Sequence, residues 1–180
     1  MKEVEVKILE VDRKKLEATL NGLGAKKIFD GHVQTMFLDF EDGRILKEKN
    51  LLRLRKEEGK AELTFKKVRV TDAAKVADEY SVEVSSLEIA RKIMENLGLL
   101  VIESIEKNRV SFILDDGRFD FDRYFGAYAF IPEFVEIEAK SVELVRKYAA
   151  LLGFKAEDCH PWSTNDLIQH YTSEEGQKKN

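Results

Sequence analysis

Charged and aliphatic residues alternate from the first residues of this chain. In the opening stretch MKEVEVKI, the charged side chains of Glu3, Glu5 and Lys7 are separated by single aliphatic residues. Successive side chains of a β-strand point to opposite faces, so this pattern predicts a strand with one charged face and one aliphatic face.

The same alternation predicts further strands. Two pairs of them flank short turns at Glu58-Gly59 and Asp116-Gly117, as expected for β-hairpins. The polar positions of these strands, each facing an apolar set, are Arg53 and Arg55; Glu62, Thr64 and Lys66; Glu79, Ser81 and Glu83; Lys107, Arg109 and Ser111; Asp120 and Asp122; and Glu136 and Glu138.

Three segments share one plan, which indicates a weak internal repeat. Residues 3–28, 78–104 and 134–156 each read as a strand, a Ser or Asp that can cap a helix, an amphipathic helix and a Leu-Gly stop. The expected apolar stripes are Leu16, Leu20 and Leu23; Ile89, Ile93 and Leu97; and Leu144, Tyr148 and Leu152. Eight strands, mostly in hairpins, with three or four helices predict an α+β fold with an antiparallel sheet.

Composition narrows the class of protein. A chain of 180 residues with 43% hydrophobic content suits a single domain, which we place at residues 1–172, followed by a polar tail at 173–180. A net charge of −4 argues against a nucleic-acid partner. Cys159 is the single cysteine, and no apolar run reaches membrane-spanning length. We therefore expect a cytoplasmic protein without a membrane partner.

The charged strand faces allow two interpretations. In one, they are the wet face of an open sheet. In the other, about eight strands close into a barrel whose charged faces point inward. Nearly every position on these faces carries a full charge, and acids and bases gather on different strands. Charges buried inside a barrel need opposite charges to compensate them. A polyanion bound to the basic side chains and a divalent metal bound to the acidic ones would supply these.

The order of these motifs carries a family resemblance over residues 1 to about 167. The motifs are Glu-x-Glu-x-Lys at Glu3, Glu5 and Lys7; Arg-x-Arg at Arg53 and Arg55; a strand lysine at Lys66; an acid at Glu83; Lys-x-Arg at Lys107 and Arg109; Asp122; and the acidic pair Glu136 and Glu138. The chain resembles the CYTH superfamily, the triphosphate tunnel metalloenzymes, which includes class IV adenylate cyclases and thiamine triphosphatases.

The resemblance implies an eight-stranded antiparallel β-barrel, or tunnel, with a charged interior and helices packed on the outside. It assigns triphosphate binding to Arg53, Arg55, Lys66, Lys107 and Arg109. It assigns one or two Mg²⁺ or Mn²⁺ ions to Glu3, Glu5, Glu83, Glu136 and Glu138. Lys7 and Asp122 are the catalytic candidates.

Three functions follow as hypotheses. The first is a class IV adenylate cyclase-like enzyme that converts ATP to cyclic AMP and pyrophosphate. The second is a triphosphatase that hydrolyses thiamine triphosphate, inorganic triphosphate (tripolyphosphate) or a nucleotide, and the third is a non-catalytic binder of polyphosphate or nucleotide. Residues 68–79 read as a long polar connection, and the aromatic stretch 124–134 as core, base contact or partner contact. The oligomeric state is left open, with a homodimer among the alternatives.

Overall fold

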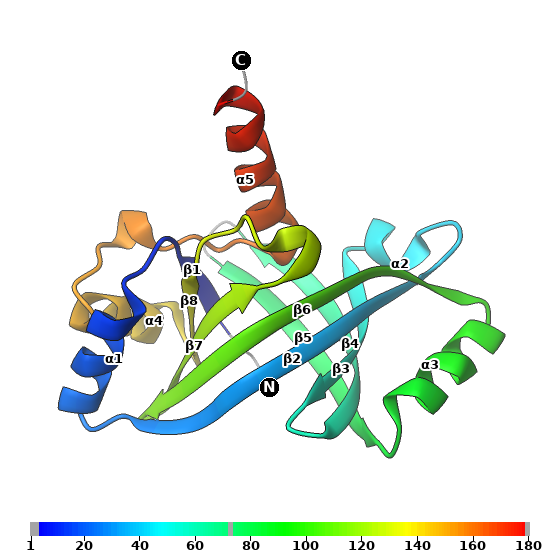
Figure 1. Cartoon of the computed structure of the whole chain (residues 1–180), viewed down its shortest axis with the longest axis horizontal. Coiled ribbons are helices and arrows are strands. Elements are labelled where there is room, and N and C mark those ends of the chain that lie inside the picture. Colours follow the sequence, from blue (N-terminus) through cyan, green and yellow to red (C-terminus); the bar gives the residue numbers. More distant parts are fainter. Residues whose placement is uncertain (1–3, 72–73, 179–180) are drawn as a thin grey trace. The chain divides into compact units, whose positions relative to one another are not determined.

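The computed structural model describes residues 4–71 and 74–178, with side chains for residues 4–67 and 78–173. The predicted metal ligand Glu3 lies outside the described residues. The strands are β1 (Val4–Ile8), β2 (Lys26–Phe40), β3 (Asn50–Glu57), β4 (Lys60–Thr71), β5 (Ala74–Val84), β6 (Leu99–Leu114), β7 (Gly117–Tyr124) and β8 (Phe134–Ala139). The α-helices are α1 (Arg13–Gly22), α2 (Arg44–Lys47), α3 (Leu87–Asn96), α4 (Val142–Leu151) and α5 (Thr164–Lys178) (Figure 1).

The strands form one eight-stranded sheet in the order β1-β8-β7-β6-β2-β3-β4-β5. The pairs β1–β8, β7–β8, β2–β3, β3–β4 and β4–β5 are all antiparallel. This confirms the predicted α+β class and the eight antiparallel strands.

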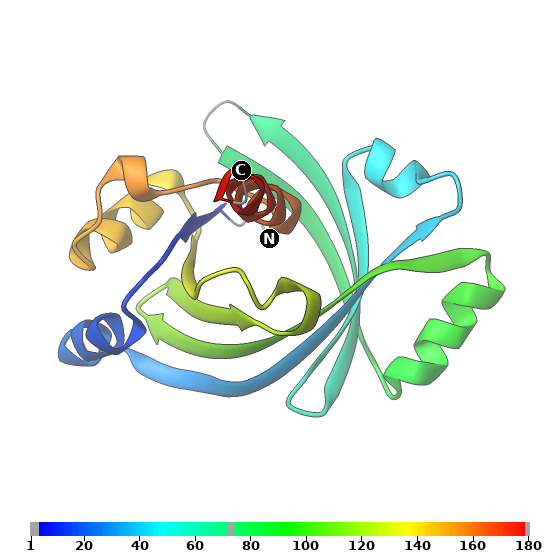
Figure 2. The same ribbon diagram turned by 45° about the horizontal axis from the view of Figure 1, so that its top comes forward.

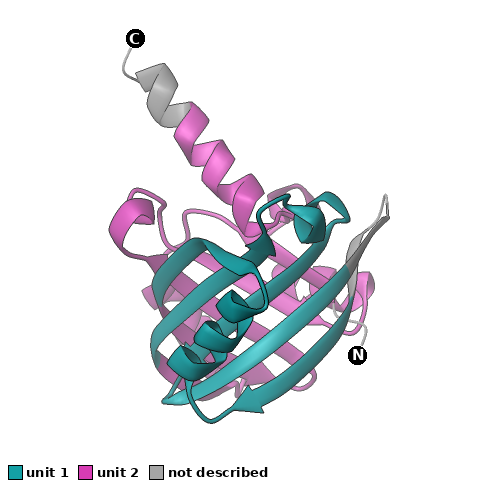
Figure 3. Ribbon diagram, turned by 90° about the vertical axis from the view of Figure 1, so that its right-hand side faces the viewer, with its two compact units in different colours: residues 1–3, 31–107 teal, residues 4–30, 108–180 magenta. Residues whose placement is uncertain are grey.

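The chain divides into two compact units, which Figure 3 colours separately. Unit 1 comprises Gly31–Lys107, and unit 2 comprises Val4–Asp30 together with the chain from Asn108 onward. The long strands β2 and β6 each contribute residues to both units, so each unit is built from sequence segments that are far apart.

Unit 2 buries the aliphatic and aromatic faces of its strands beneath helices. Helix α4 packs on β1, β7 and β8 (Figures 1 and 2). The Phe119 ring meets the Tyr148 ring edge-on, with centroids 5.5 Å apart. Leu16 and Leu20 of α1 are buried as well. These faces are the apolar halves of the alternating pattern, so the opposite faces of the same strands carry the charges.

Unit 1 repeats this arrangement with α3. The helix packs on β3 and β4, and its Ala90 joins a core formed with Leu38, Leu54 and Leu99. On β3 and β4 the charged positions alternate with the paired residues Leu54 and Leu63, which face the core beneath α3. The charged side chains therefore lie on the sheet face away from α3.

The predicted repeat is present in the backbone. Asp12, Ser86 and Ser141 cap α1, α3 and α4, each accepting a hydrogen bond from the backbone N–H three residues later. Each helix is followed by a glycine in the left-handed region, Gly24, Gly98 and Gly153, with φ of 84°, 91° and 88°. A side chain at these positions would be strained, which explains why each helix ends in Leu-Gly.

Two expectations from the sequence are wrong. Ile89, Ile93 and Leu97 are exposed by 56%, 52% and 65%, so the expected core stripe of α3 is on the surface. The reason is that α3 packs through the neighbouring positions Leu87, Ala90 and Met94. Residues 68–79 are not a connection, because β4 extends to Thr71 and β5 begins at Ala74.

The C-terminal segment is tied to the first strand. Lys7 and His160 exchange two backbone hydrogen bonds of 2.8 and 2.9 Å. The Trp162 ring lies between two imidazoles, 4.4 Å from His160 and 4.9 Å from His170 between centroids. Helix α5 is thereby anchored beside β1, and no helix in the described part of the chain is long and apolar enough to cross a membrane.

The contact of β7 with α4 leaves no room for a side chain at Gly117. A Cβ there would lie 2.5 Å from Cε2 of the buried Tyr148 ring, so we expect Gly117→Ala to lower the free energy of unfolding by about 1–3 kcal/mol. Gly22 of α1 has open space around it, and Gly22→Ala should stabilise the protein by up to ~1 kcal/mol. Urea unfolding of both variants checks this, and equal effects would contradict it.

The partly buried position of His160 next to His170 predicts a pH dependence of stability. Partial burial, and then the neighbouring His170, lower the pKa of His160 from its ordinary 6.5. The unfolded chain therefore binds this proton more readily, and stability is lost as the pH falls below about 6.5. Urea unfolding followed by Trp162 fluorescence at pH 8 and about pH 5.5 should show a smaller loss for His160→Gln than for wild type. Identical losses would exclude His160 as the source.

Candidate functional site

In unit 2, strand register gathers charged side chains on one sheet face. Between β1 and β8, Glu5 lies opposite Glu138 and Lys7 opposite Glu136. Between β7 and β8, Asp120 lies opposite Glu136, and Arg118 opposite Glu138. Motifs separated by more than 100 residues thus meet on neighbouring strands, as the charge alternation predicted.

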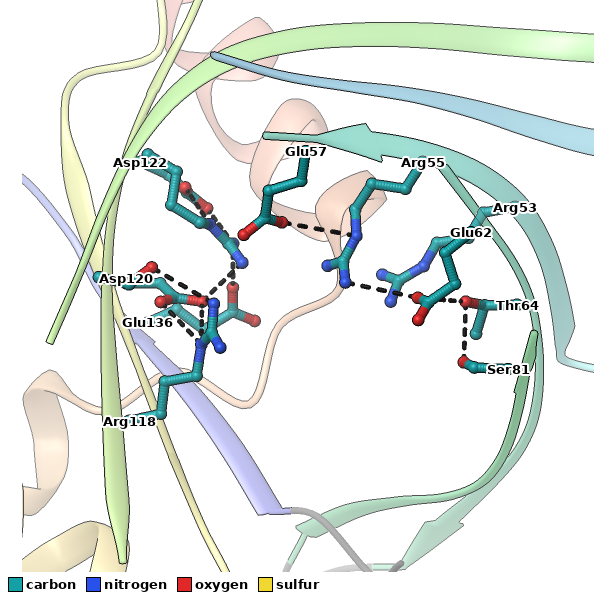
Figure 4. A network of polar contacts seen from close by, with 12 residues as sticks. Arg53, Arg55, Glu57, Glu62, Thr64, Ser81, Arg118, Asp120, Asp122 and Glu136 are labelled. Atoms are coloured by element: carbon teal, nitrogen blue, oxygen red, sulfur yellow. Dashed lines mark hydrogen bonds and ion pairs between the residues drawn. The ribbon is translucent and has the colours of Figure 1, made fainter. Parts of the chain in front are cut away.

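Arg109 of β6 is the centre of this group, which we call the acidic cluster (Glu5, Lys7, Arg109, Arg118, Asp120, Asp122, Glu136 and Glu138). Its guanidinium donates from Nε and Nη2 to both oxygens of Asp122 at 2.7 and 2.6 Å. Nη1 lies 2.5 Å from Asp120 Oδ2, and Nη2 lies 3.2 Å from Glu136 Oε2. Figure 4 shows the three carboxylates converging.

This ion group is almost completely dry. The side chains of Arg109, Asp120 and Asp122 are exposed by only 7%, 5% and 0%. Burial alone would lower the pKa of Arg109, but the charges of Asp122 and then Asp120 outweigh it and the pKa is raised well above its ordinary value. Charges buried this deeply persist only when paired, so Arg109 neutralises carboxylates that would otherwise lack compensation.

Lys7 lies at the edge of the same cluster. Its Nζ is 3.0 Å from Glu136 Oε1, and its side chain is 5% exposed. Burial alone would lower the pKa of this ammonium group, but Glu136 and then Glu5 outweigh burial and raise it. Lys7 is therefore held as a cation and hydrogen-bond donor beside Glu136.

The buried Tyr124 belongs to the same neighbourhood. Its pKa is raised by burial and then by Asp122, with Glu136 adding to this, while Lys7 and hydrogen bonding with Thr164 oppose the shift. The ring packs on Phe134, with centroids 5.6 Å apart. Part of the aromatic stretch is thus core that also reaches the charged residues.

The carboxylates of this cluster outnumber its cations. Glu5, Asp120, Asp122, Glu136 and Glu138 face Lys7, Arg109 and Arg118, which leaves two negative charges in excess. Glu5 and Glu138 are directly opposite each other, an arrangement of like charges that costs stability. Oxygen donors with excess negative charge fit a hard divalent cation such as Mg²⁺ or Mn²⁺.

No preassembled metal position exists among the side chains that the structure describes, because no three Asp, Glu, His or Cys side chains form a metal-binding group there. The guanidinium of Arg109 already lies among Asp120, Asp122 and Glu136. The donor chemistry therefore fits a metal, while the geometry is that of a cluster held by arginine.

Unit 1 carries the second group, the basic cluster (Arg53, Arg55 and Lys66, with Glu57, Glu62 and Glu79). On β3 and β4, Arg53 lies opposite Thr64 and Arg55 opposite Glu62. Lys66 lies opposite Glu79 of β5. Arg53, Arg55 and Lys66 therefore lie on the one face of three neighbouring strands that is turned away from α3.

The arginines of the basic cluster are held loosely. Arg53 Nη2 lies 3.7 Å from Glu79, and Arg55 lies 3.7 Å from Glu57 and 3.5 Å from Glu62. Their side chains are 17% and 25% exposed. These distances exceed those of good hydrogen bonds. The ion pairs of Arg55 therefore contribute little stability and can be exchanged for another anion.

Lys66 is held more tightly than the arginines beside it. Its Nζ lies 2.6 Å from Glu79 Oε2. Partial burial alone would raise the pKa of Glu79, but the hydrogen bond and charge of Lys66, with Arg53, lower it below its ordinary 4.5. Thr64 donates to Glu62 at 2.9 Å and lies 3.0 Å from the Ser81 hydroxyl (Figure 4).

The predicted site residues fall into both groups. Unit 2 brings together Glu5, Lys7, Arg109, Asp122, Glu136 and Glu138, and unit 1 holds Arg53, Arg55, Lys66, Glu83 and Lys107. Glu83 is an exposed residue opposite Glu62, and Lys107 is half-buried on β6. The Lys-x-Arg motif is thus divided, with Lys107 in unit 1 and Arg109 in unit 2.

Sequence reasoning gave no site role to five residues of these clusters, which are Arg118, Asp120, Glu57, Glu62 and Glu79, nor to the neighbouring Tyr124. Asp120, Arg118 and Glu79 had the correct parity but matched no motif of the resemblance, although each pairs directly with a predicted site residue or its partner. Tyr124 shares the strand face of Asp120 and Asp122 by parity, but a tyrosine next to a run of aromatic residues gives no charge signal in the sequence.

Comparison with known proteins supports the resemblance. A Methanocaldococcus jannaschii protein named as a candidate adenylate cyclase is 28% identical over 116 residues, which are 64% of this chain and 66% of that protein. The chain thus matches just under two thirds of that relative's length.

Two solved structures have a similar fold. The PH1012 protein of Pyrococcus horikoshii has a TM-score of 0.76 at 25% identity, covering 92% of this chain and 98% of that one. A Hippeastrum protein, described as a candidate adenylyl cyclase with a dominant triphosphatase activity, has a TM-score of 0.66 at 14% identity, covering 94% and 96%.

The family model described as "CYTH domain" matches residues 1–157, which span every strand and the first four helices. Together with the motif order and the antiparallel sheet, this match shows that the chain belongs to the CYTH domain family.

Proposed function

We propose that the protein is a metal-dependent enzyme that acts on a triphosphate, with the reaction of a class IV adenylate cyclase as the first candidate. The observation that carries this proposal is the contrast between the two clusters. One sheet face of unit 1 presents two arginines and a lysine, with Arg55 held by ion pairs no shorter than 3.5 Å, and one face of unit 2 presents carboxylates in excess.

The basic cluster suits a chain of phosphates. Guanidinium groups bind phosphate oxygens in pairs, and such charge-assisted hydrogen bonds are stronger than the present contacts of 3.5–3.7 Å. A triphosphate would therefore displace Glu57 and Glu62 from Arg55 at little cost. Lys107 is the further predicted phosphate ligand of unit 1.

We assign the divalent cation to Glu5, Glu136 and Glu138 of the acidic cluster. Two further candidate ligands lie outside that cluster: Glu3, which is outside the described residues, and Glu83, which belongs to unit 1. When bound, Mg²⁺ or Mn²⁺ would withdraw charge from the phosphate oxygens. Lys7 supplies a fixed positive charge and a hydrogen-bond donor beside Glu136. Asp122 lies behind Arg109 and is completely buried, so we assign it a positioning role through that guanidinium.

The second candidate is hydrolysis of a triphosphate. The observation in its favour is the dominant triphosphatase activity described for the Hippeastrum protein of similar fold. Both reactions need phosphate charge to be neutralised, so the two clusters serve either one. A non-catalytic binder is the third alternative.

The reaction can be identified directly. With ATP and Mg²⁺ or Mn²⁺ we expect cyclic AMP and pyrophosphate, and a chelator should abolish turnover because the acidic cluster alone cannot neutralise phosphate. Phosphate release from ATP or tripolyphosphate without cyclic AMP would replace the cyclase by a triphosphatase. Tight binding of tripolyphosphate without turnover would exclude both enzymatic hypotheses and support the non-catalytic binder.

The two arginine environments predict opposite phenotypes. Arg55→Ala should weaken tripolyphosphate binding by about 10- to 150-fold, equivalent to ~1.5–3 kcal/mol, because a charge-assisted contact is lost. Its free energy of unfolding should change by less than about 1 kcal/mol. Arg109→Ala leaves Asp120 and Asp122 buried without their cation and should cost about 3–5 kcal/mol of stability.

Titration calorimetry and urea unfolding measure the two effects separately. Lys155→Ala is the matched control, because that lysine pairs with Glu157 at the surface, where both side chains are more than 70% exposed. It should change neither quantity. Unchanged affinity in Arg55→Ala would mean that the basic cluster is a solvated sheet face, whatever the reaction of the protein.

A further inference from the structure

Helix α3 has two apolar faces, and one of them is exposed. Leu87, Ala90 and Met94 pack into the core of unit 1. Ile89, Ile93 and Leu97 follow one another at four-residue intervals and are each more than half exposed. Isolated apolar residues on a surface are ordinary, but a continuous stripe along a helix indicates a contact surface.

Strand β5 exposes two further large apolar side chains on the side of the sheet that carries α3. Tyr80 and Val82 are exposed by 65% and 57%, and they share a strand face with Val84, which packs into the core beneath α3. Val82 also lies directly opposite Leu63, another residue packed against that core. All five exposed side chains therefore lie on the same side of unit 1, the side on which α3 lies in Figure 3.

The size of this surface, which we call the α3 face (Tyr80, Val82, Ile89, Ile93 and Leu97), matches that of an interface. Five large side chains more than half exposed present on the order of 500 Å² of apolar area, since one aromatic side chain alone spans roughly 150–250 Å². A standard interface buries about 800 Å² per partner, of which somewhat more than half is apolar.

The charges around the α3 face cancel. Glu88 pairs with Lys92 at 3.1 Å, and Arg91 pairs with Glu95 at 3.5 Å. At the β5 side, Lys67 lies opposite Asp78. These pairs form a rim around the α3 face with no net charge, whereas the protein as a whole carries a net charge of −4. This rim offers nothing to a strongly charged partner and allows two copies of this chain to meet without repulsion.

The stripe is also self-complementary. Ile89 and Leu97 lie at equal intervals on either side of Ile93. If two α3 helices pack antiparallel about a twofold axis at Ile93, Ile89 of each copy lies beside Leu97 of the other. A twofold interface uses the same patch on both subunits and therefore requires this symmetry.

We propose that the α3 face is the interface of a homodimer. The interface lies on the sheet face opposite the basic cluster, so the proposal does not depend on the function of the enzyme. The partner is a second copy of this chain, because the area, the neutral rim and the symmetric stripe all suit it.

Analytical ultracentrifugation over a wide concentration range tests the proposal. The wild type should approach twice the chain mass of 20.7 kDa. Ile93→Lys places two like charges at the axis and should raise the dimer dissociation constant by at least about a hundredfold. Leu151→Lys is the matched control, because Leu151 is an exposed apolar residue on α4, 43% accessible. It should remain dimeric.

A second experiment gives a positive signal that does not depend on a disruptive variant. Cys159 is the only cysteine of the chain, so Ile93→Cys in a Cys159→Ser background has one thiol. If the twofold axis passes through position 93, the thiol of one copy lies next to the same thiol of the other. Mild oxidation should then give a disulfide-linked dimer. Leu151→Cys in the same background should remain monomeric under denaturing conditions.

Three results would overturn the proposal. A wild type that stays monomeric at all concentrations excludes the dimer, and its co-sedimentation with phosphatidylcholine vesicles would assign the α3 face to a membrane surface instead. A folded Ile93→Lys variant that remains dimeric would place the interface elsewhere. Equal cross-linking of the two cysteine variants would mean that the disulfide reports random collision.

Discussion

The bidentate contact between Arg109 and Asp122 is the interaction on which the candidate site depends. Both side chains are almost fully buried, and their atoms approach to 2.6 Å. Asp120 and Glu136 join the same guanidinium from neighbouring strands. Removing the cation would leave charges stranded in a dry interior, so this contact obliges β6, β7 and β8 to keep their register.

The two clusters use the same side-chain types for opposite purposes. In unit 2, burial and short distances make the ion pairs part of the structure. In unit 1, Arg55 contacts Glu57 and Glu62 at 3.7 and 3.5 Å and is 25% exposed. These pairs stabilise little, and we propose that they are exchanged for phosphate. Distance and burial, rather than residue type, therefore separate the residues that hold the fold from those proposed to bind ligand.

The three helix units show how far local signals reach. Asp12, Ser86 and Ser141 cap their helices as predicted, and the Leu-Gly stops end them. These features depend on backbone groups within one or two turns and are therefore readable in the sequence. The burial of the apolar stripe cannot be read in this way. Tyr148 of α4 is 1% exposed, whereas Ile93 at the corresponding position of α3 is 52% exposed.

By itself, the sequence determined which residues share a strand face, since alternation is a property of the extended backbone. It also determined the family, through the order of motifs that runs from Glu5 to Glu138. Only the tertiary structure decided that Arg109 binds Asp120 and Asp122 while Arg55 stays loosely paired, and that Tyr124 reaches the cluster. The physical reason is that pairing and burial depend on neighbouring strands and packed helices, which no local pattern specifies.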